Sequence, residues 1–107
     1  MEDPRVLKIT TLDKGWRDKD QVMLHACFQL LCDCIENENL FTGHVQWDHD
    51  EEHITAKKEL LALYDWWKQR VERDKKGEID SIWGEGQYEE DDAMLIRLIQ
   101  HRKYLWT

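Results

Sequence analysis

Apolar residues recur with helical spacing in three stretches of the chain, and this pattern predicts three amphipathic helices. The helices are expected at about residues 20–38, 50–73 and 88–104. In chain order, their apolar faces contain Val22, Met23, Ala26, Cys27, Leu30, Leu31 and Cys34, with Leu24, Phe28 and Ile35 beside them; Ile54, Leu60, Leu61, Tyr64, Trp67 and Val71; and Met94, Leu95, Leu98, Ile99 and Leu105. The sequence therefore predicts a mainly α-helical fold, a small bundle of about three helices.

The two ends of the chain carry different patterns. Residues 1–17 include an apolar and β-branched run from Val6 to Thr10, followed by the break Lys14-Gly15-Trp16. We expect an extended arm or a short strand there, although one strand cannot form a sheet alone. At the other end, Trp106 is expected either to dock into the core, which we favour, or to contact a partner.

The length and composition of the chain favour one domain without a membrane segment. Two halves of a 107-residue chain would each be too small to bury a sufficient core. No apolar run approaches the roughly 20 residues of a membrane-spanning helix, and the charged Met1–Arg5 start lacks the apolar core of a signal peptide. Cys27, Cys32 and Cys34 are an odd number in one predicted helix, so we expect reduced thiols in the core. These features favour the cytosol.

The net charge of −8 is unevenly distributed along the chain. Between Asp20 and Ala56 there is no Lys or Arg, while eight acids account for a charge equal to that of the whole chain. If the first predicted helix packs beside the start of the second, one end of the molecule is strongly negative, which attracts basic protein surfaces and repels nucleic acid. The alternative is that the runs Asp48–Glu52 and Glu89–Asp92 only cap helices and keep the protein soluble.

A basic stretch follows two adjacent tryptophans in the second predicted helix. Lys68, Arg70 and Arg73 beside Trp66 and Trp67 resemble a nucleic-acid patch, but the acidic net charge argues against direct nucleic-acid binding. Adjacent residues of a helix lie about 100° apart, so we expect Trp67 in the core and Trp66 beside it. Trp66 is then either an aromatic anchor for a partner or a contact within its own domain.

Two histidines with metal-ligand spacing lie at the N-terminus of the second predicted helix. His49 and His53, with Glu52, match the His-x-x-Glu-His pattern of inverted zinc peptidases. The motif coincides with a helix start that requires acids, and no third ligand follows in a supporting context. No phosphate-binding glycine loop or serine nucleophile elbow is present. We therefore expect no enzyme activity and no cofactor, with His49 and His53 as weak metal candidates.

The C-terminal segment from Tyr88 to Thr107, with Met94-Leu95-Ile96-Arg97-Leu98-Ile99 at its centre and Tyr104-Leu105-Trp106-Thr107 at its end, resembles the ending of small uncharacterised tailed-bacteriophage proteins. The entry from Trp47 to His53 and the segment Leu63–Trp67 extend the resemblance over residues 20–107. The resemblance implies a phage product in the bacterial host cytosol. Small acidic phage proteins often block host machinery such as CRISPR effectors, restriction enzymes and polymerases, so this class of target is expected by analogy.

Three functional hypotheses follow. In the first, the chain binds and inhibits or modulates a host protein that has a basic surface, through Asp33, Glu36, Glu38, Asp48, Asp50 and Glu51, with Trp66 as an aromatic anchor. In the second, it is a structural or assembly protein that acts as a homodimer or larger homo-oligomer. In the third, it binds a metal ion through His49 and His53.

Overall fold

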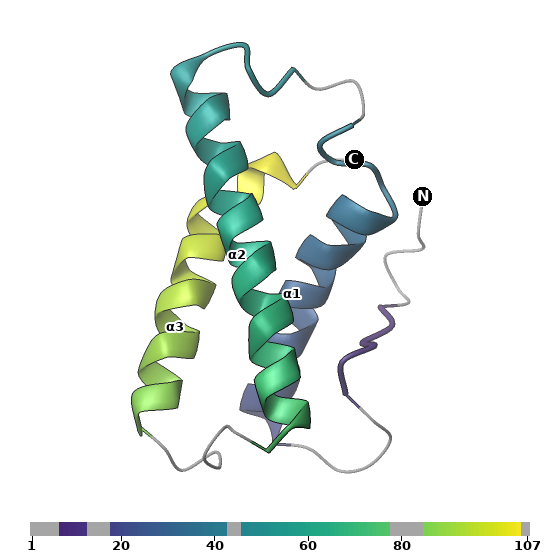
Figure 1. Ribbon diagram of the computed structural model, residues 1–107, viewed down its shortest axis with the longest axis vertical. Helices are drawn as coiled ribbons and strands as arrows, with labels where there is room; N and C mark the ends of the chain where they lie inside the picture. The colour runs from purple at the N-terminus through teal and green to yellow at the C-terminus, as the bar shows by residue number, and fades with distance from the viewer. Residues whose placement is uncertain (1–6, 13–17, 43–45, 78–84, 106–107) are drawn as a thin grey trace.

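The computed structural model describes residues 7–12, 18–42, 46–77 and 85–105, and these form a helical bundle. Helix α1 spans Lys19–Glu36, α2 spans Glu51–Lys75 and α3 spans Glu85–Gln100, followed by the short 3-10 helix η1 at Arg102–Tyr104. All three α-helices pack against one another, with α2 antiparallel to α1 and α3 (Figure 1). The mainly α-helical prediction is confirmed.

The N-terminal arm is described only in part. Residues 7–12 contain no strand, and the remainder of the predicted arm, residues 1–6 and 13–17, lies outside the described residues. Trp106, expected to dock into the core, also lies outside them. The buried aromatic side chain near the C-terminus is that of Tyr104, which η1 places against the start of α2. Within the described residues, no helix is long and apolar enough to cross a membrane.

Local signals fix the helix ends. Asp50, in extended conformation, is the N-cap of α2, and its carboxylate accepts the backbone N–H of His53 at 2.8 Å. Arg73 and Lys75 lie in the last turn of α2, where cations complement the helix dipole. Gly77 follows with a φ of 71°, a left-handed conformation that glycine adopts without strain.

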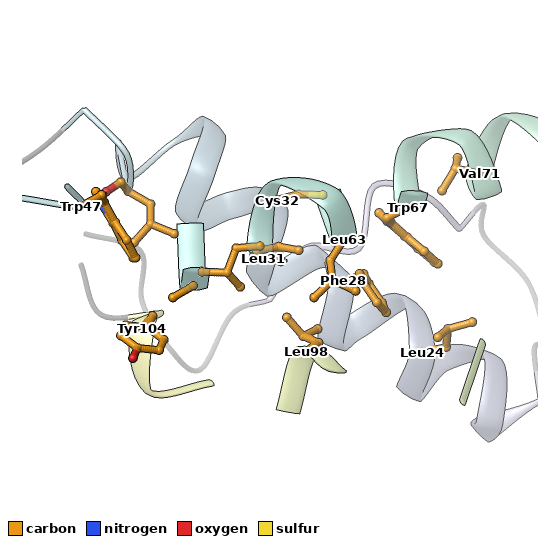
Figure 2. Close-up of a cluster of buried hydrophobic side chains, with 13 residues drawn as sticks. Leu24, Phe28, Leu31, Cys32, Trp47, Leu63, Trp67, Val71, Leu98 and Tyr104 are labelled. Atoms are coloured by element: carbon orange, nitrogen blue, oxygen red, sulfur yellow. The ribbon is translucent and has the colours of Figure 1, made fainter. Parts of the chain in front are cut away.

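Aromatic rings at the contact between α1 and α2 form the centre of the core. The Trp67 ring stacks on Phe28 at a centroid distance of 4.8 Å (Figure 2). The His25 ring meets Trp67 edge-on at the same distance. Leucines from all three helices surround these rings, including Leu31, Leu63 and Leu98. Trp67 is 1% exposed, so its predicted place in the core is confirmed.

The buried face of α1 differs from the predicted one. Met23 and Leu30 are 57% and 50% exposed, whereas the polar side chains of His25 and Gln29 are buried. The N-terminal arm explains the difference, because Thr11 Oγ1 lies 2.7 Å from His25 Nδ1 and Thr10 donates to Gln29 Oε1. These hydrogen bonds offset the cost of burying the polar groups.

A buried ion pair joins α2 to α3. Arg70 Nε and Nη2 each donate to a different oxygen of Asp91 at 2.9 Å, a bidentate arrangement. Gln87 also donates to Asp91, while Arg70 Nη1 is buried without a described hydrogen-bond partner. In the sequence, Arg70 belongs to the basic stretch after Trp67 and Asp91 to the acidic run Glu89–Asp92, and the structure places both side chains inside the bundle.

Candidate functional site

The acidic residues predicted to bind a partner lie in two groups, one beside the middle of α2 and the other at its start. Asp33, Glu36 and Glu38 lie at the end of α1, and Asp48, Asp50 and Glu51 lie at the start of α2. Glu36 contacts Tyr64 and Lys68, so α1 ends beside the middle of α2. Thirteen residues separate Glu51 from Tyr64, which corresponds to about 20 Å along the helix. The acidic end of α1 therefore does not pack beside the start of α2, and the two acidic groups do not form the single negative end expected from that packing.

Internal partners hold much of the acidic group at the end of α1. Glu36 accepts hydrogen bonds from Lys68 and from the Tyr64 hydroxyl. The Lys68 hydrogen bond is the largest cause, and the Tyr64 hydrogen bond the next, of a Glu36 pKa below its usual value. Asp33 accepts from Gln29 at 2.9 Å and from Asn37 at 3.3 Å. Glu36 therefore stays ionised near neutral pH, and the hydrogen bonds of Glu36 and Asp33 stabilise the end of α1.

At the start of α2, one acid caps the helix and two others face the solvent. The backbone N–H of His53, followed by its ring, lowers the pKa of Asp50. Asp48 and Glu51 are exposed and lie on either side of this cap in the sequence. Asp48 and Glu51 therefore provide the most accessible negative charge of the second group.

An open groove of about 580 Å³ has Asp48 among its lining residues. Among its lining residues are Phe41, Trp47, Asp48, Ile54, Lys57 and Leu61. The Trp47 indole N–H donates to the Leu40 carbonyl at 2.9 Å, and this buried hydrogen bond fixes one wall of the groove. The helical pattern of the sequence does not predict this groove, because Phe41 and Trp47 lie in a connection without helical periodicity. The only local signal was the presence of large aromatic residues between two predicted helices.

Trp66 does not form an exposed anchor beside the acidic residues. Its ring is half-buried against Phe28, at a centroid distance of 5.4 Å, and its indole N–H donates to Glu90 of α3 at 2.7 Å. Arg73 donates to the same Glu90 oxygen at 2.9 Å. Trp66 thus stabilises the α2–α3 contact, and the alternative of a contact within its own domain is the one that the structure supports.

The histidines at the start of α2 contact each other and the capping acid. The rings of His49 and His53 are 5.5 Å apart, and Asp50 Oδ1 lies 2.8 Å from His53 Nδ1. Glu52, the proposed general base of a zinc site, instead accepts hydrogen bonds from Lys103 and Tyr104. Across the described ranges, no three His, Cys, Asp or Glu side chains gather in a group that could hold a metal ion. This arrangement gives no support to a catalytic zinc site.

The cysteines are reduced, and burial governs the acidity of two of them. Burial raises the pKa of the Cys32 thiol to about 11, and it also raises the pKa of Cys27. A raised pKa reduces the fraction of thiolate, which is the reactive form of cysteine. Cys32 therefore has the character of a small core residue.

Comparison of the chain with known protein families, curated proteins and solved structures found no match.

Proposed function

We propose that this chain is a non-catalytic protein that binds a basic surface of another protein. In the phage setting that the C-terminal resemblance implies, the partner is a host protein, such as a nucleic-acid-handling or defence complex. The observation that carries the proposal is the charge distribution. From Asp20 to Ala56, which covers nearly all of α1, the connection and the start of α2, there are eight acids and no Lys or Arg.

The two acidic groups contribute to binding in different ways. His53 lowers the pKa of Asp50, so Asp50 stays ionised near neutral pH and adds long-range negative potential, whereas the ion pair with Lys68 cancels most of the long-range charge of Glu36. Such a potential steers a basic partner toward the surface and raises its association rate. Asp48 and Glu51 are exposed and are therefore the residues that contact Lys or Arg side chains directly.

The groove supports the same proposal by adding apolar area next to the charge. Trp47, Phe41 and Ile54 contribute to its wall, and Asp48 lies at its edge. Interfaces gain most of their affinity from side chains buried in such pockets, with charged contacts at the rim. Because Lys57 and Lys58 also line the groove, the partner surface that fits presents an apolar side chain to the groove and a Lys or Arg side chain to Asp48.

The test is affinity capture of the tagged protein from bacterial lysate, with mass spectrometry of the captured proteins. The groove variant, Asp48→Asn with Glu51→Gln, removes one exposed charge that lines the groove and a second exposed charge at the start of α2. The control Asp65→Asn with Glu72→Gln removes two exposed charges elsewhere on α2, so the net charge changes equally. We expect the first variant to lose a partner that the wild type and the control retain.

The salt dependence provides a second measure. Capture by the wild type should weaken as salt is raised from about 0.05 to about 0.5 M, because screening reduces exposed charge contacts. Capture that is unchanged in the groove variant, or that decreases equally in both variants, would rule out a localised acidic binding surface.

A further inference from the structure

Besides Tyr88, whose hydroxyl donates to Asp20, four large apolar side chains are exposed on the helices α1 and α3. Met23 and Leu30 of α1 are 57% and 50% exposed, and Ile96 and Ile99 of α3 are 54% and 55% exposed. Single exposed apolar residues are common on protein surfaces, but a contiguous group marks an interaction site. If these four side chains share one face of the bundle, they indicate an interaction site; if they do not, they are ordinary exposed residues.

Helix geometry places all four side chains on the face opposite α2. Phe28 contacts the α2 rings, and Met23 and Leu30 lie about 140° and about 160° from it around α1. On α3, Glu90 contacts α2, and Ile96 and Ile99 lie about 120° and about 180° from it. The parallel helices α1 and α3 are adjacent, since Tyr88 donates a hydrogen bond to Asp20 (Figure 1). We call this surface the α1/α3 face.

The apolar positions of the α1/α3 face have a two-fold pattern. On α1, the stripe Met23, Cys27, Leu30 and Cys34 has spacings of four, three and four residues, which read the same in both directions. On α3, Ile96 and Ile99 are centred between residues 97 and 98. The hydrogen bond between Tyr88 and Asp20 shows that these two residues lie at similar positions along the bundle axis. Measured from them, the centres of the two stripes differ in position along that axis by no more than about one helical turn.

This pattern matches a two-fold axis that lies in the face and is perpendicular to the helices. Such an axis places each helix antiparallel to its own copy, so that an isologous contact forms. It would bring Ile96 opposite Ile99 of the partner subunit and Cys27 opposite the partner subunit's Leu30.

The charges at the ends of α3 favour the same orientation. The helix begins with exposed acids, including Glu89 and Asp92, and is followed by the exposed base Arg102. Antiparallel pairing places the acidic end of one copy near the basic end of the other, and it also opposes the helix dipoles. Parallel pairing would instead bring like charges together.

We propose that the α1/α3 face binds a second copy of this chain, forming a weak, symmetric dimer. Helices of about 25 Å in length at a spacing of about 10 Å present a face of about 500 Å² per copy. The pair buries about 1,000 Å² in total, which is at the lower limit for a specific interface. We therefore expect a dissociation constant of the dimer in the micromolar range, on the order of 10–100 µM.

Sedimentation equilibrium of the purified full chain tests the proposal. We expect a concentration-dependent monomer–dimer equilibrium between about 5 and 500 µM, a range that spans the expected dissociation constant. The variant Ile96→Glu with Ile99→Glu adds charge at two exposed positions and should weaken the dimer at least tenfold. The control Leu7→Glu changes an exposed apolar residue of the N-terminal arm and should leave it unchanged. Equal unfolding midpoints establish that the variants are folded.

The proposal does not depend on the acidic partner surface, and salt separates the two. The charges at the ends of α3 select the antiparallel orientation, but the net interaction between two copies of charge −8 is repulsive. Screening should therefore preserve or tighten the dimer as salt rises, whereas partner capture should weaken. A strictly monomeric protein at about 500 µM, well above the expected dissociation constant, would overturn the proposal. An equal loss in the Leu7 control, or dissociation at high salt, would also overturn it.

Discussion

The buried pair Arg70–Asp91 allows a quantitative prediction about stability. The two side chains are 3% and 7% exposed, and two hydrogen bonds of 2.9 Å join them. Substitution of Asp91 by Ala would leave the Arg70 guanidinium charged and enclosed without its partner. Breaking a buried pair in this way typically costs about 3–5 kcal/mol. A domain of this size has a total stability of roughly 5–15 kcal/mol, so Asp91→Ala removes a large part of it.

Two further variants separate the charge from the packing. Asp91→Asn retains the shape and one acceptor oxygen but loses the negative charge, and we expect a loss of about 2–3 kcal/mol. Replacing both partners in Arg70→Met with Asp91→Leu removes both desolvated charges, and we expect a stability within about 1 kcal/mol of the wild type. The exposed Asp65→Asn is the control, with an expected change within about 0.5 kcal/mol.

Urea unfolding at pH 7, followed by far-UV circular dichroism, gives the free energy of unfolding for each variant. The slope of that free energy against urea shows whether the two-state analysis applies. If Asp91→Ala lowered the free energy of unfolding by less than about 1 kcal/mol, the reasoning would be refuted, because a buried guanidinium without a partner destabilises the folded state by more than that. A double variant as unstable as Asp91→Ala would refute it as well.

Two other predictions concern hydrogen bonds of tryptophan. Trp47→Phe removes the N–H donor to the buried Leu40 carbonyl and should lower the free energy of unfolding by about 2–3 kcal/mol. Trp66→Phe, at a half-buried site, should lower it by about 1 kcal/mol. Equal losses in urea unfolding would contradict the burial argument. Hydrogen bonds from Trp66 and, to a smaller extent, from Arg73 lower the pKa of Glu90 in the folded state. The ionised Glu90 therefore stabilises the folded protein above pH 4.5, its ordinary pKa, and this stabilisation is lost as the pH falls through the folded-state pKa. Glu90→Gln should therefore cost up to about 1 kcal/mol at pH 7, screened by solvent, and almost nothing near pH 3; a difference that is constant with pH would contradict this assignment.

The helices were predictable from the sequence because periodicity and end signals act locally. The predicted ranges 20–38 and 50–73 lie close to the observed α1 and α2. The third helix was expected to continue to residue 104, but α3 ends at Gln100 and the chain turns into η1. Insertion of Tyr104 against His53 and Trp47 explains this early end, and such a contact across the chain leaves no local signal.

The buried faces were harder to predict, because burial depends on partners that are distant in the sequence. His25 and Gln29 are buried through residues of the N-terminal arm, and Ile99, expected in the core, is exposed. Charge clustering identified the acidic stretch, since it is a property of composition. The groove and the internal contacts of Trp66 depend on how the connection and α3 pack, which the helical period does not specify.

The pair Arg70–Asp91 has a consequence for the uniqueness of the fold. The apolar stripe of α3 can in principle slide along α2 by one turn, about 5.4 Å, with other side chains filling the gaps. Any such slip would separate two enclosed charges, so the pair selects one register among several of similar apolar packing. By this reasoning, the double replacement Arg70→Met with Asp91→Leu would preserve stability while allowing more than one register. Broadened or doubled amide resonances of α3 in that variant, absent from the wild type, would reveal the alternative registers.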